Sequence, residues 1–233
     1  ILFIRRSKIS LKFINKIINK NKNMKKISVL VLVFLMTTVT AVEAVTDNEG
    51  TNLQTTVQDT ITIDCDGSDG QDTVNLGALT AGTPVTGSTA CVVTTNSDGG
   101  YVLEVEQDGN SGSTTMDHQS DATADIADKT AWDQTANTGD GNAAAYATTG
   151  LGFGVLSSTA TKNTTWWGTG SACTDAGQLY AGIPSNGASN NNIMEHSSYS
   201  GTSTTTTVCY KLDVSATQKA GIYDGVVTYT ATT

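Results

Sequence analysis

A short acidic stretch of the sequence has the residue types that could bind a metal ion. Asp64, Asp66, Asp69 and Asp72 recur within nine residues that also include two glycines. Ca²⁺ takes roughly six to eight oxygen ligands, and aspartates on a glycine-flexed turn can bring several carboxylates together. The spacing differs from that of an EF-hand loop, and Asp and Gly also favour simple solvated turns. These four residues therefore have two interpretations, a calcium site and a simple solvated acidic turn.

Two adjacent tryptophans, Trp166 and Trp167, form the second candidate binding group. Exposed aromatic rings can stack on the apolar faces of sugars, so the pair could serve a carbohydrate-binding module. That function requires at least one ring to be exposed in a groove. We favour the alternative, in which a tryptophan is buried beneath the loop that carries Cys173.

The patterns that indicate catalysis are absent from the sequence. His118 and His196 stand in polar stretches, and we expect both to be solvated loop residues. No Gly-x-Ser-x-Gly or His-Glu-x-x-His motif occurs, and nothing selects a pair of carboxylates for glycoside hydrolysis. The glycine-rich residues 150–154 lack the strand–turn–helix setting of a phosphate loop, and we expect a closely packed strand there. The sequence therefore favours a protein that is not an enzyme.

All four cysteines lie in the part of the chain that we expect to be exported, where an even number indicates disulfides. Four cysteines allow three pairings. We favour Cys65–Cys91 and Cys173–Cys209, because each pair would join neighbouring segments. No C-x-x-C spacing occurs, which argues against zinc and redox motifs.

Alternation of apolar and polar residues predicts the strands that must position these groups. The predicted strands span residues 60–65, 73–79, 90–96, 101–107, 151–156, 208–214 and 223–231. Residues near 179–183 have two interpretations, a further short strand or a loop. The turn signal at 97–100 predicts that 90–96 and 101–107 form a β-hairpin. Cys209 should face away from the core, toward a covering loop that contains Cys173.

Two long segments, 108–149 and 157–202, are rich in small polar residues, and we expect them to be loop insertions. Strands at both ends and a loop-rich middle predict an all-β fold, an immunoglobulin-like antiparallel β-sandwich of about seven to nine strands. We expect residues 58–233 to form this single domain after a flexible lead at 45–57.

The N-terminal region predicts export. Met24, two lysines, the apolar run 27–39 and the small residue Ala44 have the order of a secretory signal peptide at 24–44. Cleavage after Ala41 is an alternative. The apolar run is shorter than the roughly 20 residues of a spanning helix, so we expect no membrane span in the mature chain. We interpret residues 1–23 as sequence upstream of the true start, or as a basic extension of the signal peptide.

Removing the signal peptide makes the protein strongly acidic. Nine of the 13 basic residues and one of the 22 acidic residues precede residue 45, which leaves four basic and 21 acidic residues and a net charge of −17. Such a surface repels nucleic acid and anionic lipid. It suits divalent cations or a basic partner.

Two segments resemble the WxL-like bacterial surface domains and uncharacterised secreted proteins of that type. One runs from Val74-Asn75-Leu76-Gly77 through Cys91-Val92-Val93-Thr94-Thr95-Asn96 to Gly100-Tyr101, and the other is Ala220-Gly221-Ile222-Tyr223-Asp224-Gly225. The resemblance implies an immunoglobulin-like sandwich at the cell surface, and WxL proteins attach non-covalently to peptidoglycan. The Trp-x-Leu motif itself is absent here. A weaker resemblance to pilin-like and spore-coat-U-like domains implies subunits joined by strand exchange, with 45–58 as the donor strand.

These observations predict a secreted, cell-surface-associated structural or adhesive protein without enzymatic activity. Its partner would be a cell-envelope polymer or another surface protein, and no cofactor is expected apart from the calcium hypothesis. The alternatives are a carbohydrate-binding module that uses Trp166 and Trp167, a pilin-like subunit, and a secreted hydrolase.

Overall fold

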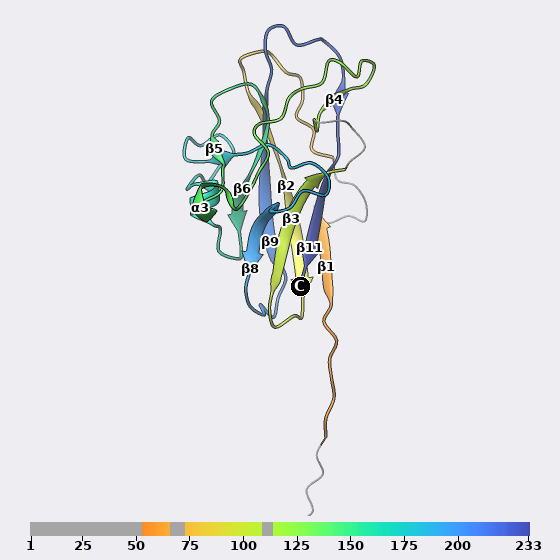
Figure 1. Ribbon diagram of the computed structural model, residues 1–233, viewed down its shortest axis with the longest axis vertical. Helices are drawn as coiled ribbons and strands as arrows, with labels where there is room; N and C mark the ends of the chain where they lie inside the picture. Colours follow the sequence, from red (N-terminus) through yellow and green to blue (C-terminus); the bar gives the residue numbers. More distant parts are fainter. Residues whose placement is uncertain (1–52, 66–72, 109–113) are drawn as a thin grey trace, which may run out of the picture. The chain divides into compact units, whose positions relative to one another are not determined.

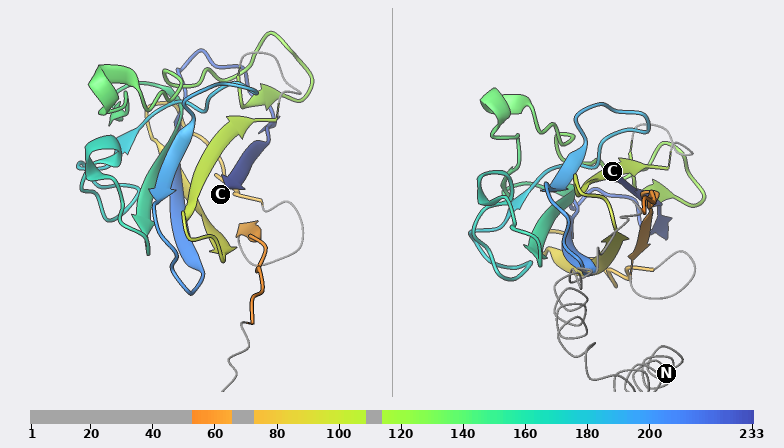
Figure 2. Two further views of the ribbon diagram at one scale, coloured as in Figure 1. Left: turned by 60° about the horizontal axis from the view of Figure 1, so that its bottom comes forward. Right: turned by 90° about the horizontal axis from the view of Figure 1, so that it is seen from below.

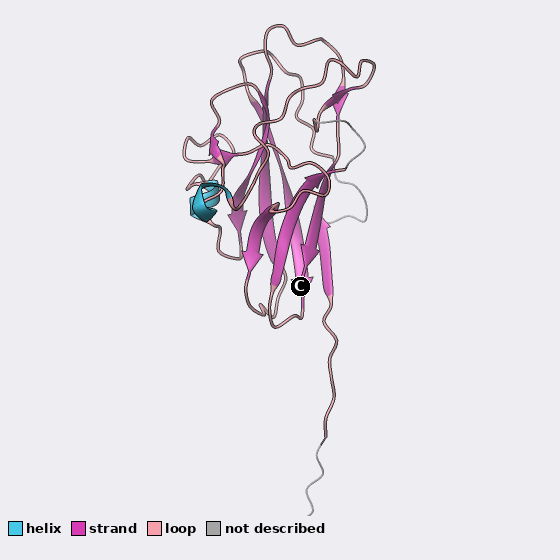
Figure 3. Cartoon of the chain, viewed as in Figure 1, coloured by secondary structure: helices cyan, strands magenta, loops and turns pink. Residues whose placement is uncertain are grey.

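A computed structural model describes residues 53–65, 73–108 and 114–233 of the chain. The chain divides into two compact units, 1–55 and 56–233, and the second is an all-β domain. Figures 1 and 3 show long strands packed in layers at one end of this domain and loops at the other. Within the described ranges, no helix has both the length and the apolar character needed to cross a bilayer.

Two antiparallel sheets form the sandwich. The first has four strands in the order β1-β2-β9-β6, and the second has three strands in the order β11-β3-β8. The bounds in the first sheet are β1 (Ile61–Cys65), β2 (Val85–Thr95), β9 (Thr204–Asp213) and β6 (Gly150–Ser158). Those in the second are β11 (Val227–Thr232), β3 (Tyr101–Gln107) and β8 (Asn192–His196). The all-β sandwich predicted from the sequence is therefore confirmed.

Short elements occur in the long loop segments. Two small antiparallel pairs join β4 (Asp117–His118) to β10 (Tyr223–Asp224) and β5 (Ala144–Ala145) to β7 (Leu179–Tyr180). The helical turns are α3 (Ala136–Gly139) and α4 (Thr164–Trp167). In α4 the side chain of Asn163 accepts hydrogen bonds from the backbone N–H groups of Thr165 and Trp166, which caps the turn.

The core lies between the two sheets and follows the predicted alternation. In β3, Tyr101, Leu103 and Val105 are buried, while Glu104 and Glu106 are partly exposed. The fully or almost fully buried apolar side chains from the other strands are Val93, Phe153, Val155, Ile193, Met194, Val208 and Leu212. Burial of each large apolar side chain stabilises the fold by about 1.5–3 kcal/mol.

The predicted hairpin between residues 90–96 and 101–107 is wrong. β2 pairs with β1 and β9, whereas β3 pairs with β11 and β8, so the turn at 97–100 crosses from one sheet to the other. Alternation identifies the buried face of a strand but not its neighbour in the sheet. Gly100 makes the crossing possible, because its φ is +77° and a Cβ there would lie 1.7 Å from the carbonyl oxygen of His196.

Three other strand predictions differ from the structure. Residues 73–79 form no strand; Val74 and Leu76 instead pack over Gly87, which leaves room for them. The predicted strand 223–231 is split into β10 and β11. Strand β8 lies inside the expected loop 157–202, where Ile193 and Met194 stand between three asparagines and Glu195-His196 and give little signal.

Two disulfides hold the first sheet. Cys65 in β1 lies directly opposite Cys91 in β2 and is bonded to it. The second bond joins Cys173, in the loop after α4, to Cys209 in β9. These are the two pairings favoured from the sequence. A native disulfide typically stabilises a domain by about 2–4 kcal/mol, chiefly by restricting the unfolded chain.

Candidate functional site

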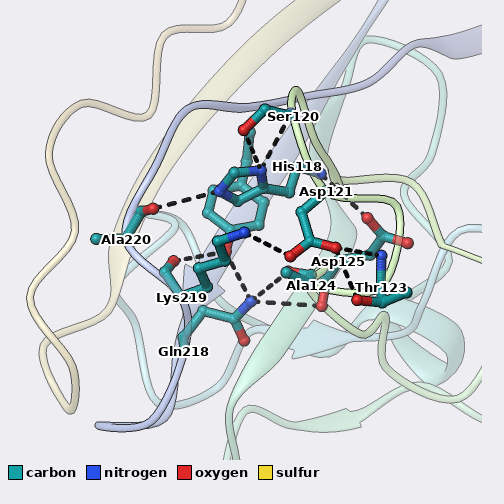
Figure 4. A network of polar contacts seen from close by, with 10 residues as sticks. His118, Ser120, Asp121, Thr123, Ala124, Asp125, Gln218, Lys219 and Ala220 are labelled. Carbon is teal, nitrogen blue, oxygen red and sulfur yellow. Dashed lines mark hydrogen bonds and ion pairs between the residues drawn. The ribbon is translucent and has the colours of Figure 1, made fainter.

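The loop end of the sandwich is held by a polar network between residues 117–125 and 218–224, which we call the loop clasp (Figure 4). The pairing of β4 with β10 places Tyr223 opposite His118 and Asp224 opposite Asp117. The backbone N–H of Gln119 also donates to the carbonyl of Ile222 at 3.0 Å. The clasp thus joins segments about 100 residues apart in the sequence.

His118 lies at the centre of the clasp and is only 7% exposed, so the expectation that it is a solvated loop residue is wrong. The backbone N–H of Ser120 donates to His118 Nδ1 at 3.2 Å, and Nε2 lies 3.3 Å from the carbonyl oxygen of Ala220. This geometry places the proton on Nε2, which then donates to that carbonyl. The ring also packs edge-on to Tyr223, with 4.9 Å between centroids.

Side chains on both loops complete the clasp. Lys219 Nζ lies 2.5 Å from Asp121 Oδ2, and this hydrogen bond lowers the pKa of the Asp121 carboxyl, with further help from Thr123. Gln218 Nε2 donates to the Ala124 carbonyl at 2.6 Å and to the Tyr223 hydroxyl at 2.9 Å (Figure 4). Because both members of the ion pair are partly exposed, we expect the buried His118 contacts to contribute more stability.

A pocket of about 350 Å³ opens beside the clasp. It is lined by Gln107, Thr114, Ala127, Asp128, Lys129, Ala131, Ile183 and Ser185. Asp128 Oδ2 accepts hydrogen bonds from Thr115 N at 2.8 Å, Thr115 Oγ1 at 3.0 Å and Gln107 Nε2 at 2.8 Å. Its buried Oδ1 has no hydrogen-bond partner in the described part of the chain. Burial outweighs the three hydrogen bonds and raises the Asp128 pKa to about 6.

The chemistry available in this pocket is limited. Asp128 is the single carboxyl among the lining residues, and none of the others is a histidine or a cysteine. The Lys129 ammonium, the other charged group, donates to the carbonyl and hydroxyl oxygens of Thr148. The pocket can therefore hold a proton or a hydrogen-bonding group. His196, the second histidine, is half-buried and stacks on the Tyr101 ring with 5.7 Å between centroids.

The tryptophans anchor the long loop segments instead of presenting a binding surface. Trp166 is 8% exposed and Trp167 is fully buried, so neither offers the open ring face that sugar stacking requires. Trp132 packs against both, with centroids 5.6 and 4.4 Å away. The core role favoured from the sequence is therefore confirmed, and the carbohydrate-binding hypothesis for this pair is not supported.

The indole N–H groups of these anchors bond to the main chain. Trp132 Nε1 donates to the Asn192 carbonyl at 2.7 Å, and Trp167 Nε1 donates to the Ile193 carbonyl at 2.9 Å. Both acceptors belong to β8, an edge strand. The two indoles thus satisfy backbone carbonyls at that edge, which sequence reasoning did not anticipate.

A cluster of cations and aromatic rings covers the outer side of the first sheet. Lys129 Nζ lies 4.2 Å and Lys211 Nζ 5.0 Å from the centre of the Tyr146 ring, and Tyr180 packs edge-on to the same ring. Two of the four basic residues after position 44 therefore meet at one tyrosine. Their separation in the sequence left no local signal for this arrangement.

The proposed calcium ligands Asp66, Asp69 and Asp72 lie outside the described residues. Asp64 is exposed in β1, where its side chain points away from the core. In the described ranges, no group of three or more His, Cys, Asp or Glu side chains is arranged to hold a metal ion. Calcium binding remains a sequence-based hypothesis.

Comparison with known proteins gives no match to any protein-family model, curated protein or solved structure. Function must therefore be argued from the geometry of this chain.

Proposed function

We propose that the protein is exported and acts at the cell surface as a non-enzymatic structural or adhesive domain. In this role the sandwich, which includes β8, is a rigid scaffold, and the parts of segments 108–149 and 157–202 outside β8 are displayed. Loops on a rigid scaffold commonly carry the binding functions of β-sandwich proteins.

The attachment of the long loops to the scaffold is the observation that carries this proposal. Trp132 and Trp167 bond to β8, and Cys173 is covalently bonded to β9. Trp166 Nε1 donates to the Gly139 carbonyl at 3.0 Å and so joins the two loop segments to each other. The loop clasp fixes a further part of 108–149. Loops held at this many points have a defined surface, which suits a binding or structural partner.

Export is supported by the predicted signal peptide and by the two disulfides, since disulfides persist in oxidising compartments. The net charge of −17 after residue 44 keeps such a domain soluble and disfavours nucleic acid.

Fractionation of the source cells without reducing agent tests the proposal. We expect the full disulfide-bonded protein in the envelope fraction, released by denaturant or salt. Recovery from the cytoplasm with free thiols, or solely from the medium, would contradict a surface role.

A further inference from the structure

Two side chains from different segments donate to the same carboxylate oxygen. Asp128 Oδ2 lies 2.8 Å from Gln107 Nε2 and 3.0 Å from Thr115 Oγ1. Gln107 is the last residue of β3, and Thr115 lies shortly before β4. Figures 1 and 2 show the end of β3 beside the segment that leads to β4. A primary amide and a hydroxyl are therefore both held within hydrogen-bond distance of one atom.

The amide and the hydroxyl are shielded from water and fixed in place. Gln107 is 5% exposed and Thr115 is 2% exposed. The backbone N–H of Thr115 also donates to Asp128 Oδ2 at 2.8 Å, and the backbone N–H of Gln107 donates to the Pro184 carbonyl at 2.9 Å. Reacting groups that are well oriented within one molecule can behave as if present at about 10⁵–10⁸ M. The arrangement thus favours a reaction between these two side chains.

The carboxylate between them can accept a proton and return it. A threonine hydroxyl is a weak nucleophile until a neighbouring base removes its proton. An amide nitrogen, in turn, must gain a proton before it can leave. Asp128 Oδ2 contacts both groups, and burial raises the Asp128 pKa to about 6, near the pH at which it would act. One residue can therefore serve both proton transfers.

We infer that Thr115 and Gln107 form an intramolecular ester bond in the folded protein. Asp128 takes the proton of the Thr115 hydroxyl, and Oγ1 attacks the side-chain carbonyl carbon of Gln107. Asp128 then returns the proton to Nε2, the C–N bond breaks and ammonia leaves. One C–O bond replaces one C–N bond, no atom is oxidised or reduced, and Asp128 is regenerated.

The pocket gives the ammonia a way out, because Gln107 and Asp128 both line it. Ammonia becomes ammonium in the surrounding water, and its dilution draws the reaction forward. The product fastens the start of segment 108–149 covalently to β3. This consequence concerns the chain itself and does not depend on where the protein acts.

The ester should form slowly, after folding is complete. Thr115 Oγ1 donates to the carboxylate, and Gln107 Nε2 has a second acceptor, the Ile183 carbonyl, at 3.4 Å. These hydrogen bonds must yield before Oγ1 reaches the amide carbon. Freshly folded protein is therefore the unreacted form, and the Asp128 contacts and pKa given above belong to it. The stability of Asp128 variants is to be compared in this form.

Intact mass, measured at intervals during incubation at neutral pH, tests the inference with the disulfide-bonded chain from residue 45. We expect freshly folded protein to have its full mass. Over days, the folded protein should lose the mass of one ammonia molecule. Protein kept unfolded and reduced should keep its full mass, because the three side chains are then far apart.

A peptide map locates the bond. A protease that cleaves before aspartate cuts at Asp108 and so separates Gln107 from Thr115 in the sequence. In incubated protein the peptides 98–107 and 108–116 should nevertheless remain joined. Mild alkali should release them, because it hydrolyses an ester, and residue 107 should then be recovered as glutamate.

Variants assign the roles of the three residues. Thr115→Val removes the nucleophile and Asp128→Asn removes the base, so both should keep the full mass while circular dichroism shows an unchanged fold. Thr115→Ser retains a hydroxyl and should still lose ammonia. The matched control is Thr114→Val, which removes the neighbouring hydroxyl, a donor to Asp117. It should lose ammonia as the wild type does.

Wild-type protein that keeps its full mass throughout the incubation would overturn the inference. Equal loss of ammonia from Thr115→Val would do the same. Asn186-Gly187 could also lose ammonia, by closure of a succinimide ring on the asparagine. Ammonia loss with 98–107 and 108–116 recovered as separate peptides would therefore place the reaction elsewhere and contradict the ester.

Discussion

At the scale of single residues, burial decides which polar groups matter. His118 and Asp128 belong to polar stretches of the sequence, yet His118 is buried and Asp128 is partly buried, with its Oδ1 enclosed. Their partners come from distant segments: Ala220 for His118, and Gln107 and Thr115 for Asp128. No local pattern contains that information, so the sequence could not identify the burial of His118 or the partial burial of Asp128.

Asp128 should make stability depend on pH. Its pKa is about 6 in the folded protein and 3.8 in the reference state, so the folded chain binds more protons between these values. The stability that this group contributes is present below about pH 4 and is lost as the pH rises through 6. We therefore expect Asp128→Asn to be more stable than the wild type at pH 7 by roughly 1–3 kcal/mol.

Denaturant unfolding from pH 4 to pH 8 measures this difference. The difference in the free energy of unfolding between the two proteins should shrink toward pH 4. At that pH a protonated Asp128 and an asparagine both carry a hydrogen-bond donor in the side chain, where the charged carboxylate has an unpartnered Oδ1. Asp140→Asn, at an exposed position, is the control for the loss of one charge. Parallel stability profiles for Asp128→Asn and the wild type would contradict the raised pKa.

Gly225 directly follows one segment of the loop clasp and allows a close approach to Thr115, which lies just before the other segment. A Cβ on this residue would lie 1.6 Å from the carbonyl oxygen of Thr115. We expect Gly225→Ala to lower the free energy of unfolding by at least about 2 kcal/mol, because backbone must move to relieve the contact. Gly99→Ala, where the nearest atom is 3.9 Å away, should be close to neutral in the same thermal or denaturant melts.

At the scale of elements, the alternation of apolar and polar residues identifies the buried face of a strand but not the strands that pair with it. It predicts β1, β3 and β9 and the inward face of each. The two disulfide pairings that the structure contains were favoured on a different ground, because each joins neighbouring segments of the sequence. The sequence pattern misassigned β2 and β3 to a hairpin and missed β8. Strand order depends on contacts between distant segments, which a period of two residues does not encode.

The tryptophan anchors should be unequal in strength. Trp167 is fully buried and bonds to β8, whereas Trp166 is slightly exposed and bonds to the loop at Gly139. Phenylalanine keeps an aromatic ring but removes the indole N–H and leaves a small cavity. We expect Trp167→Phe to cost about 2–4 kcal/mol and Trp166→Phe clearly less. Equal losses in denaturant unfolding would mean that the edge of β8 does not depend on Trp167.

At the scale of the whole molecule, a small sandwich holds two long loop segments in fixed positions. The disulfide Cys173–Cys209, three tryptophans and the loop clasp hold these segments at separate points. Most of the anchoring side chains are buried, while acidic and small polar residues form much of the outer surface. This division between anchoring and displayed residues is what a binding or structural surface requires.

Removal of Cys173–Cys209 should loosen one displayed loop without unfolding the sandwich. Replacing both cysteines by serine should lower the free energy of unfolding by about 2–4 kcal/mol. Limited proteolysis should then cut within residues 168–178, a segment that should resist cleavage in the wild type because the disulfide holds it against β9. Equal resistance in the two proteins would show that the tryptophans alone hold this loop.

The central claim, that this domain is displayed outside the cell, is tested most directly by labelling intact source cells with an amine reagent that does not cross membranes. Lys219, with its side chain 49% exposed, is the residue to follow by peptide mapping. The proposed function predicts that Lys219 is modified on intact cells, in a protein whose four cysteines are all disulfide-bonded. Modification that appears solely after lysis would contradict it.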